Sequence, residues 1–314
     1  MSRVCAFAIV IIATLVVSLR SMGGQSLGPG AQRPPFRSSV DVIAMNVTVT
    51  DGSGRYVTDL DRQDFQIFED RRLQQVTFFQ KSNLPLALAL LIDTSASMDQ
   101  SLAVAQEAAV GFVRALGPAD VASVIVFDTR VQVHQDFTSD RTALERAIRQ
   151  TAAGGSTALY NAVYIALKEL NKTIRDQPLA ESRRRAIVIL SDGEDTSSLV
   201  GFDEVLDLAA RSDTAIYAIG LLGQEVPGTR KPEDAQFVLR RLAQTTGGRA
   251  FFASAAKDLN NVYGEIREEL SNQYFLAYES NNLRRDGQFR RIAVRVERSG
   301  VVARARPGYY APSK

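Results

Sequence analysis

The sequence contains only one cysteine, and the position of that residue restricts the chemistry available to the chain. Cys5 lies inside an uncharged, apolar segment near the start of the 314 residues. If this segment is removed during export, the remaining chain has no thiol group. Disulfide bonds and thiolate metal sites are then excluded.

The chain also lacks an excess of charge of either sign. It has 37 lysine and arginine residues against 35 acidic residues. Loss of Arg3 and Arg20 with an N-terminal segment would leave 35 of each, so the net charge would be zero. No general attraction to nucleic acid follows. The run Arg183-Arg184-Arg185 precedes an apolar segment, and we expect it to be a solvated turn.

Several motifs of common enzyme classes are missing. There is one histidine, and no Gly-x-Ser-x-Gly elbow or Gly-x-Gly-x-x-Gly loop follows any predicted strand. Aspartyl-phosphate enzymes need a second carboxylate two positions after the first, where this chain has Ser95. His134 lies in an alternating stretch that predicts a hairpin or edge strand. These absences favour a binding module over an enzyme.

The N-terminal segment has the pattern of a signal peptide. Residues 4–19 carry no charge, follow Arg3 and give way to a small, polar run at residues 21–26. This apolar segment is shorter than the roughly 20 residues that a membrane-spanning helix needs, although retention as an anchor is the alternative. We expect a signal peptide at residues 1–24, a linker at residues 25–37 and a secreted, periplasmic or cell-envelope location. Membrane attachment is expected only if the segment is retained.

Short alternating segments occur on both sides of the central part of the chain. Residues 38–82 and residues 273–310 both show the period of two that predicts strands. Neither flank would bury much apolar surface alone. We therefore expect the two flanks to pair into one β-sandwich, with a separate domain at residues 84–272 inserted between them.

The central region alternates apolar runs with helical patterns. The run from Leu84 to Ile92 is almost unbroken, which is typical of a strand buried on both faces of a parallel sheet. Helical patterns separate it from four further runs, at residues 122–127, 186–190, 215–219 and 250–252. This order predicts a doubly wound, mostly parallel α/β sheet. Ligands bind such sheets beyond the carboxyl ends of the strands.

Oxygen-bearing side chains follow two of these runs. Asp93, Ser95 and Ser97 come directly after the first run, and Asp192 follows the run at residues 186–190. Thr157 lies between them, after a Gly-Gly pair and before a helical pattern. Carboxylate and hydroxyl oxygens suit Mg²⁺, Mn²⁺ or Ca²⁺. Each motif taken alone is equally compatible with a helix cap or a plain turn.

Together these five residues resemble the metal-ion-dependent adhesion site of von Willebrand factor A and integrin I domains. The resemblance covers about residues 84–272. It implies that a divalent cation, Mg²⁺ before Mn²⁺ or Ca²⁺, contacts the hydroxyls, whereas the two carboxylates act largely through water. It also implies an open position for a Glu or Asp carboxylate of a protein or peptide partner.

Two further carboxylates could support the site from behind the direct ligands. Asp128 follows the run at residues 122–127, and Glu194 lies beside Asp192. A turn or cap is the alternative for Asp128, and a solvated acidic turn is the alternative for Glu194.

The flanks resemble bacterial proteins described only as related to von Willebrand factor A. The residues that carry this resemblance include Val47-x-Val49-x-Asp51-x-x-Gly54 and the closing Arg306-Pro307-Gly308-Tyr309. The resemblance favours a bacterial envelope location. The sequence as a whole favours an extracytoplasmic, metal-dependent adhesion or protein-binding module. The alternatives are an envelope assembly protein that uses the sandwich as its contact surface, and a metal-dependent hydrolase.

Overall fold

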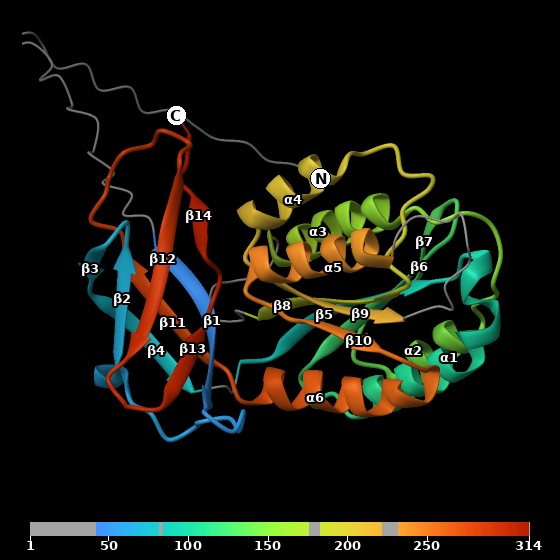
Figure 1. Ribbon diagram of the computed structural model, residues 1–314, viewed down its shortest axis with the longest axis horizontal. Coiled ribbons are helices and arrows are strands. Elements are labelled where there is room, and N and C mark those ends of the chain that lie inside the picture. The colour runs from blue at the N-terminus through green and yellow to red at the C-terminus, as the bar shows by residue number, and fades with distance from the viewer. Residues whose placement is uncertain (1–41, 82–83, 176–182, 222–231, 314) are drawn as a thin grey trace, which may run out of the picture. The chain divides into compact units, whose positions relative to one another are not determined.

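The computed structural model describes residues 42–81, 84–175, 183–221 and 232–313 (Figure 1). The expected signal peptide and linker lie outside the described residues. Within the described ranges, no helix is both long enough and apolar enough to cross a membrane.

The central region forms a six-stranded sheet in the order β10-β9-β8-β5-β6-β7. All neighbours in it are parallel except β7, which is antiparallel to β6. This confirms the doubly wound fold, and β7 is the edge strand predicted around His134. The strands are β5 (Leu86–Asp93), β6 (Val121–Phe127), β7 (Val131–Thr138), β8 (Arg184–Ser191), β9 (Thr214–Leu221) and β10 (Ala250–Ala253).

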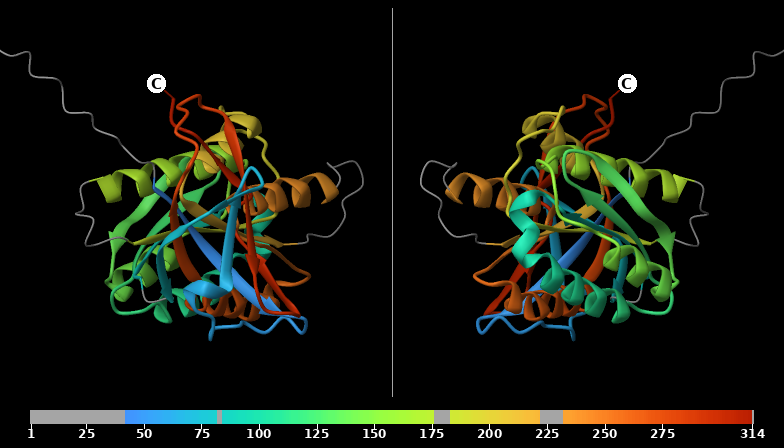
Figure 2. Two further views of the ribbon diagram at one scale, coloured as in Figure 1. Left: turned by 90° about the vertical axis from the view of Figure 1, so that its left-hand side faces the viewer. Right: turned by 90° about the vertical axis from the view of Figure 1, so that its right-hand side faces the viewer.

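Helices cover both faces of this sheet (Figures 1 and 2). Every residue of β5 is buried, and its side chains alternate between two separate apolar cores. Leu88 and Leu90 pack with one set of helices, while Ala89 and Leu91 pack with the other. The first set is α1 (Asp99–Arg114), α2 (Arg141–Arg149) and α6 (Leu259–Ser271). The second set is α3 (Leu159–Arg175), α4 (Phe202–Arg211) and α5 (Pro232–Thr246).

The two flanks form two further antiparallel sheets, and each sheet contains strands from both flanks. Their orders are β13-β1-β11-β4 and β14-β12-β2-β3. The N-terminal strands are β1 (Val42–Asp51), β2 (Phe65–Glu69), β3 (Arg72–Gln74) and β4 (Val76–Lys81). The C-terminal strands are β11 (Tyr274–Glu279), β12 (Phe289–Val296), β13 (Val301–Arg304) and β14 (Gly308–Tyr310).

These two sheets share one apolar core. Val47 of β1, Ile67 of β2 and Leu276 of β11 are all fully buried in it. Because β11 lies between β1 and β4, neither N-terminal strand could complete its sheet without the C-terminal flank. The predicted pairing of the flanks into one sandwich is therefore confirmed.

The expectation of a solvated turn at the arginine run is wrong. Arg184 and Arg185 are the first residues of β8, and Arg184 is buried. Its guanidinium donates hydrogen bonds to the carbonyls of Leu84 and Leu270. These backbone carbonyls replace the water molecules that the guanidinium loses when it is buried.

The sandwich and the α/β region are joined by an ion pair between a buried glutamate and a half-buried arginine. Glu269 near the end of α6 is 1% exposed, and its Oε1 lies 2.5 Å from Nη2 of Arg304 in β13. The same oxygen accepts a hydrogen bond of 2.8 Å from the hydroxyl of Tyr217 in β9. Arg304 also donates to the carbonyls of Gly247 and Gly248. One acidic side chain therefore links three elements that are far apart in sequence.

Replacing Leu276 by Ala should destabilise both N-terminal strands that border β11. A buried Leu→Ala change costs about 2–5 kcal/mol through lost burial and a cavity. Hydrogen exchange should therefore accelerate in β1 and β4 as well as in β11. Val302→Ala, at a position 66% exposed in β13, is the matched control and should change stability by less than about 0.5 kcal/mol. Unchanged protection of β1 would contradict a shared sandwich.

Candidate metal centre

The predicted ligands Asp93 and Asp192 lie at the point of the sheet where the order of the strands reverses. β5 pairs with β6 on one side and with β8 on the other, so the connections leave the centre of the sheet in opposite directions. Asp93 is the last residue of β5, and Asp192 directly follows β8. This is the switch point at which open α/β sheets bind their ligands.

Four of the five predicted ligands form a continuous chain of hydrogen bonds. The backbone N–H of Ser95 donates to Oδ1 of Asp93 at 2.9 Å. The hydroxyls of Ser95 and Ser97 lie 3.1 Å apart. The Ser97 hydroxyl then donates to Oδ2 of Asp192 at 2.5 Å. Two carboxylates and two hydroxyls are thus brought together from two loops.

Thr157, the fifth predicted ligand, is tied by its main chain to the loop that follows β8. Its N–H donates to the Thr196 hydroxyl at 2.9 Å. Its carbonyl accepts hydrogen bonds from the N–H groups of Thr196 at 2.8 Å and Ser197 at 3.0 Å. The loop before α3 is therefore fixed to the loop that carries Asp192.

The glycine pair before Thr157 fixes the same loop to the loop after β5. The N–H of Gly154 donates to the Thr94 carbonyl at 2.7 Å, and the carbonyl of Gly155 accepts from Ala96 N–H at 3.1 Å. Gly155 has a φ of +76°, and a Cβ there would lie 2.7 Å from the Thr129 hydroxyl oxygen. Only glycine meets both requirements without strain.

Burial and like charge act together on Asp93. The residue is fully buried, and desolvation together with the nearby charge of Asp192 raises its pKa to about 7. The hydroxyl of Ser191 opposes this shift by donating to Oδ2 of Asp93 at 2.6 Å. A cation beside the two carboxylates would offset both unfavourable effects.

The donor set suits a hard cation. Across the described ranges, no three or more His, Cys, Asp or Glu side chains are grouped to hold a metal ion. The cluster instead offers two carboxylates and neutral hydroxyls, which match the oxygen preference of Mg²⁺ and Ca²⁺.

The two additional carboxylates named from the sequence have local roles. Oδ1 of Asp128 accepts a hydrogen bond from Arg130 N–H at 2.7 Å, which closes its own turn, and its carbonyl accepts from Ala158 N–H. The N–H of Glu194 donates to Oδ1 of Asp192 at 3.1 Å. Glu194 thus orients Asp192 through its main chain.

The contacts of two further residues at this site were not predicted from the sequence. Ser191 is buried, donates to Asp93 and accepts from Gly193 N–H at 3.0 Å. Its place at the end of a strand beside Asp192 was the available signal. Asp195 accepts from Tyr160 N–H at 3.1 Å and so caps the start of α3. No sequence signal marks that cap, because the two residues are 35 positions apart.

The central region also matches a known family model. Residues 88–194, which include all five predicted ligands, match the von Willebrand factor type A domain. The α/β region has a von Willebrand factor A-type fold.

Solved structures of other proteins have a similar fold. A solved von Willebrand factor type A protein from Catenulispora acidiphila is 13% identical, with a TM-score of 0.51 over 89% of this chain and 76% of that chain. The pilus adhesin SpaC of Lactobacillus rhamnosus GG, in its open conformation, is 10% identical, with a TM-score of 0.51 over 79% of this chain and 48% of that chain.

A curated relative covers less of the chain. Inter-alpha-trypsin inhibitor heavy chain H1 of Sus scrofa is 24% identical over 200 residues. The match spans 60% of this chain but only 22% of that protein.

Replacing Gly155 by Ala should destabilise the A-type domain by about 1–3 kcal/mol, because the new Cβ combines a left-handed backbone with a close contact. Gly154→Ala is the matched control, since a Cβ at Gly154 meets nothing within 4 Å. That change should stay within about 0.5 kcal/mol of the wild type. Urea unfolding curves measure both changes, and equal effects of the two substitutions would contradict the described loop geometry.

Proposed function

We propose that this chain is an exported, metal-dependent protein-binding module of the adhesion type. Its site would hold a divalent cation, Mg²⁺ before Mn²⁺ or Ca²⁺, between Asp93, Ser95, Ser97, Thr157 and Asp192. The observation that carries the proposal is the hydrogen-bonded chain from Asp93 through the two serines to Asp192 at the switch point of the sheet.

The residues around the ligands are arranged to hold them in place before any ion binds. Asp93 is fixed by Ser191 on one oxygen and by Ser95 N–H on the other. Asp192 is fixed in the same way by Ser97 and by Glu194 N–H. Such preorganisation reduces the entropy lost when a ligand binds.

The neutral hydroxyls determine what the site would recognise. If Ser95, Ser97 and Thr157 supply the direct contacts, the bound cation offers an electron-poor position for one more oxygen ligand. A Glu or Asp carboxylate of a protein or peptide partner meets that requirement, because oxygen ligands with negative charge bind hard cations most strongly. The partner's acidic residue would therefore complete the coordination shell.

An enzyme is the weaker interpretation of the same residues. The hydroxyls of Ser95 and Ser97 bond to each other and to Asp192, and the Ser191 hydroxyl bonds to Asp93. None of these hydrogen bonds runs to a histidine or lysine base. An assembly protein that uses its sandwich as the contact surface remains the alternative. Metal-independent binding would favour that alternative.

A location outside the cytoplasm is part of the proposal. The apolar N-terminal segment supports export, and the chain shares its fold with a pilus adhesin. The location would be secreted, periplasmic or at the cell envelope.

Asp192→Asn should weaken Mg²⁺ binding by about 10–100-fold, since it removes a charge beside the ion without changing side-chain shape. Asp128→Asn is the matched control, because that carboxylate closes its own turn, and it should leave the affinity within about twofold of the wild type. Isothermal titration calorimetry on the chelator-treated protein measures both affinities. No Mg²⁺, Mn²⁺ or Ca²⁺ binding by the folded parent would rule out the metal site.

Random peptides displayed on phage, selected in Mg²⁺ and released by chelator, should be enriched in Glu and Asp. Thr157→Val should abolish this capture because it removes only the hydroxyl, whereas Thr157→Ser should retain it. Circular dichroism should show both variants folded. Peptides that bind equally well in chelator would show that recognition does not use the metal.

A further inference from the structure

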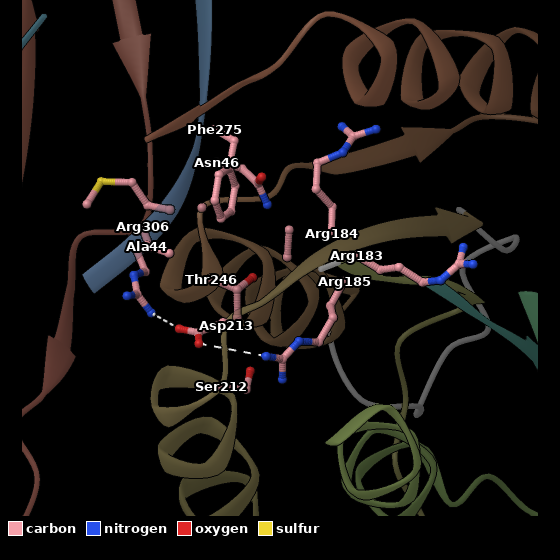
Figure 3. Close-up of a pocket in the computed structure, with 13 residues that line it drawn as sticks. Ala44, Asn46, Arg183, Arg184, Arg185, Ser212, Asp213, Thr246, Phe275 and Arg306 are labelled. Carbon is pink, nitrogen blue, oxygen red and sulfur yellow. Dashed lines mark hydrogen bonds and ion pairs between the residues drawn. The ribbon is translucent and has the colours of Figure 1, made fainter. Parts of the chain in front are cut away.

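A second candidate binding site lies at the opposite end of the parallel strands. A cavity of about 210 Å³ opens where the sandwich meets the amino ends of β8 and β9 (Figure 3). Arg184 begins β8 and Asp213 directly precedes β9, so this cavity is separated from the metal centre by the length of the strands. Its apolar wall comes from Ala44 in β1 and Phe275 in β11 (Figure 3).

The cavity is strongly basic. Four arginines and one aspartate line it, which gives the lining a net charge of +3. The guanidinium groups of Arg183 and Arg184 donate hydrogen bonds to backbone carbonyls. Their main contribution to the cavity is therefore positive charge rather than free hydrogen-bond donors. Arg185 and Arg306 instead approach Asp213 from two sides (Figure 3).

Asp213 neutralises this pair only in part. Its Oδ1 accepts from Nη1 of Arg306 at 2.7 Å, but Nη2 of Arg185 is 3.9 Å from Oδ2. At 3.9 Å the second contact is an ion pair without a hydrogen bond. Nη1 of Arg185 donates to Oδ1 of Asn171 at 2.8 Å, so Nη2 is the nitrogen of this guanidinium that keeps donor capacity beside Asp213.

Two buried polar atoms of the lining have no partner among the described residues. They are Nε of Arg306 and Oδ1 of Asn46, and Arg306 as a whole is 9% exposed. Buried polar atoms in folded proteins are nearly always hydrogen-bonded, to protein, water or ligand. A donor held in this way beside a second guanidinium is suited to an oxyanion.

We propose that this cavity binds the carboxylate or phosphate group of a small molecule. Arg306 and Arg185 would hold the oxyanion, and the Asn46 amide, which can rotate to present its donor end, would add a hydrogen bond. Any apolar body of the ligand would lie against Ala44 and Phe275. The proposal does not depend on the metal centre.

Such a ligand would join the two parts of the structure. Asn46 and Arg306 belong to the sandwich flanks, while Arg185 and Asp213 belong to the α/β region. A ligand that bridges both sets binds only when they are packed together. Binding would therefore stabilise that arrangement and raise the unfolding temperature.

The test measures binding of inorganic phosphate and of benzoate to the full chain in chelator, by calorimetry and thermal unfolding. We expect saturable binding of at least one anion, weakened about tenfold or more by Arg306→Gln and by Arg185→Gln, because each removes a charged donor. Arg291→Gln, on an exposed position of β12, is the control and should bind as the wild type does.

The two probes separate the two sources of oxyanion. Tighter binding of benzoate would indicate an organic carboxylate that uses the apolar wall, and tighter binding of phosphate would indicate a phosphate ligand. Both Arg306→Gln and Arg185→Gln are measured, so that the test still holds if one of the two variants does not fold. Binding of neither anion, or equal affinity in the wild type and in both folded variants, overturns the proposal and leaves water as the partner of the buried atoms.

Discussion

The structure depends on a buried carboxylate, Asp93, that lies beside the half-buried carboxylate of Asp192. Asp93 is the last residue of β5 and is not exposed to solvent. Asp192 is a second negative charge nearby, and its carboxylate accepts a hydrogen bond from the Ser97 hydroxyl. Burying a carboxylate beside a like charge is unfavourable unless hydrogen bonds and a counter-charge offset it. The loops after β5 and β8 supply hydrogen bonds to both carboxylates. The third loop is attached to the loop after β5 through Gly154 and the left-handed Gly155.

The two ends of the parallel strands have different surroundings. At the carboxyl ends, loops from three connections gather oxygen atoms around a small site. At the amino ends, the strands meet the sandwich through the Glu269–Arg304 ion pair and the arginine-lined cavity. Because Glu269 is buried, removing Arg304 would leave its carboxylate poorly compensated, so the pair favours one mode of packing over others. The arginine-lined cavity at the same ends of the strands is the proposed anion site.

Much of this could be predicted from the sequence because the signals were local. The unbroken apolar run before Asp93 predicted a strand buried on both faces. The polar residues after it predicted that Ser95, Ser97 and Asp192 would lie close to Asp93, whereas their role as metal ligands stays a prediction. Features set by distant contacts were not predictable. Arg184 is buried because carbonyls at Leu84 and Leu270 receive its N–H groups, and neither is near it in sequence. The position of Ser191 at a strand end was visible in the sequence, but its hydrogen bond to Asp93, 98 positions away, was not.

The most direct test of the central claim is a crystal structure of the protein grown with Mn²⁺, with anomalous diffraction used to locate the ion. The account predicts one strong peak at the carboxyl ends of β5 and β8, about 2.0–2.6 Å from the hydroxyl oxygens of Ser95 and Ser97. A well-ordered structure with no peak at that place, or with the only peak elsewhere on the chain, would contradict it.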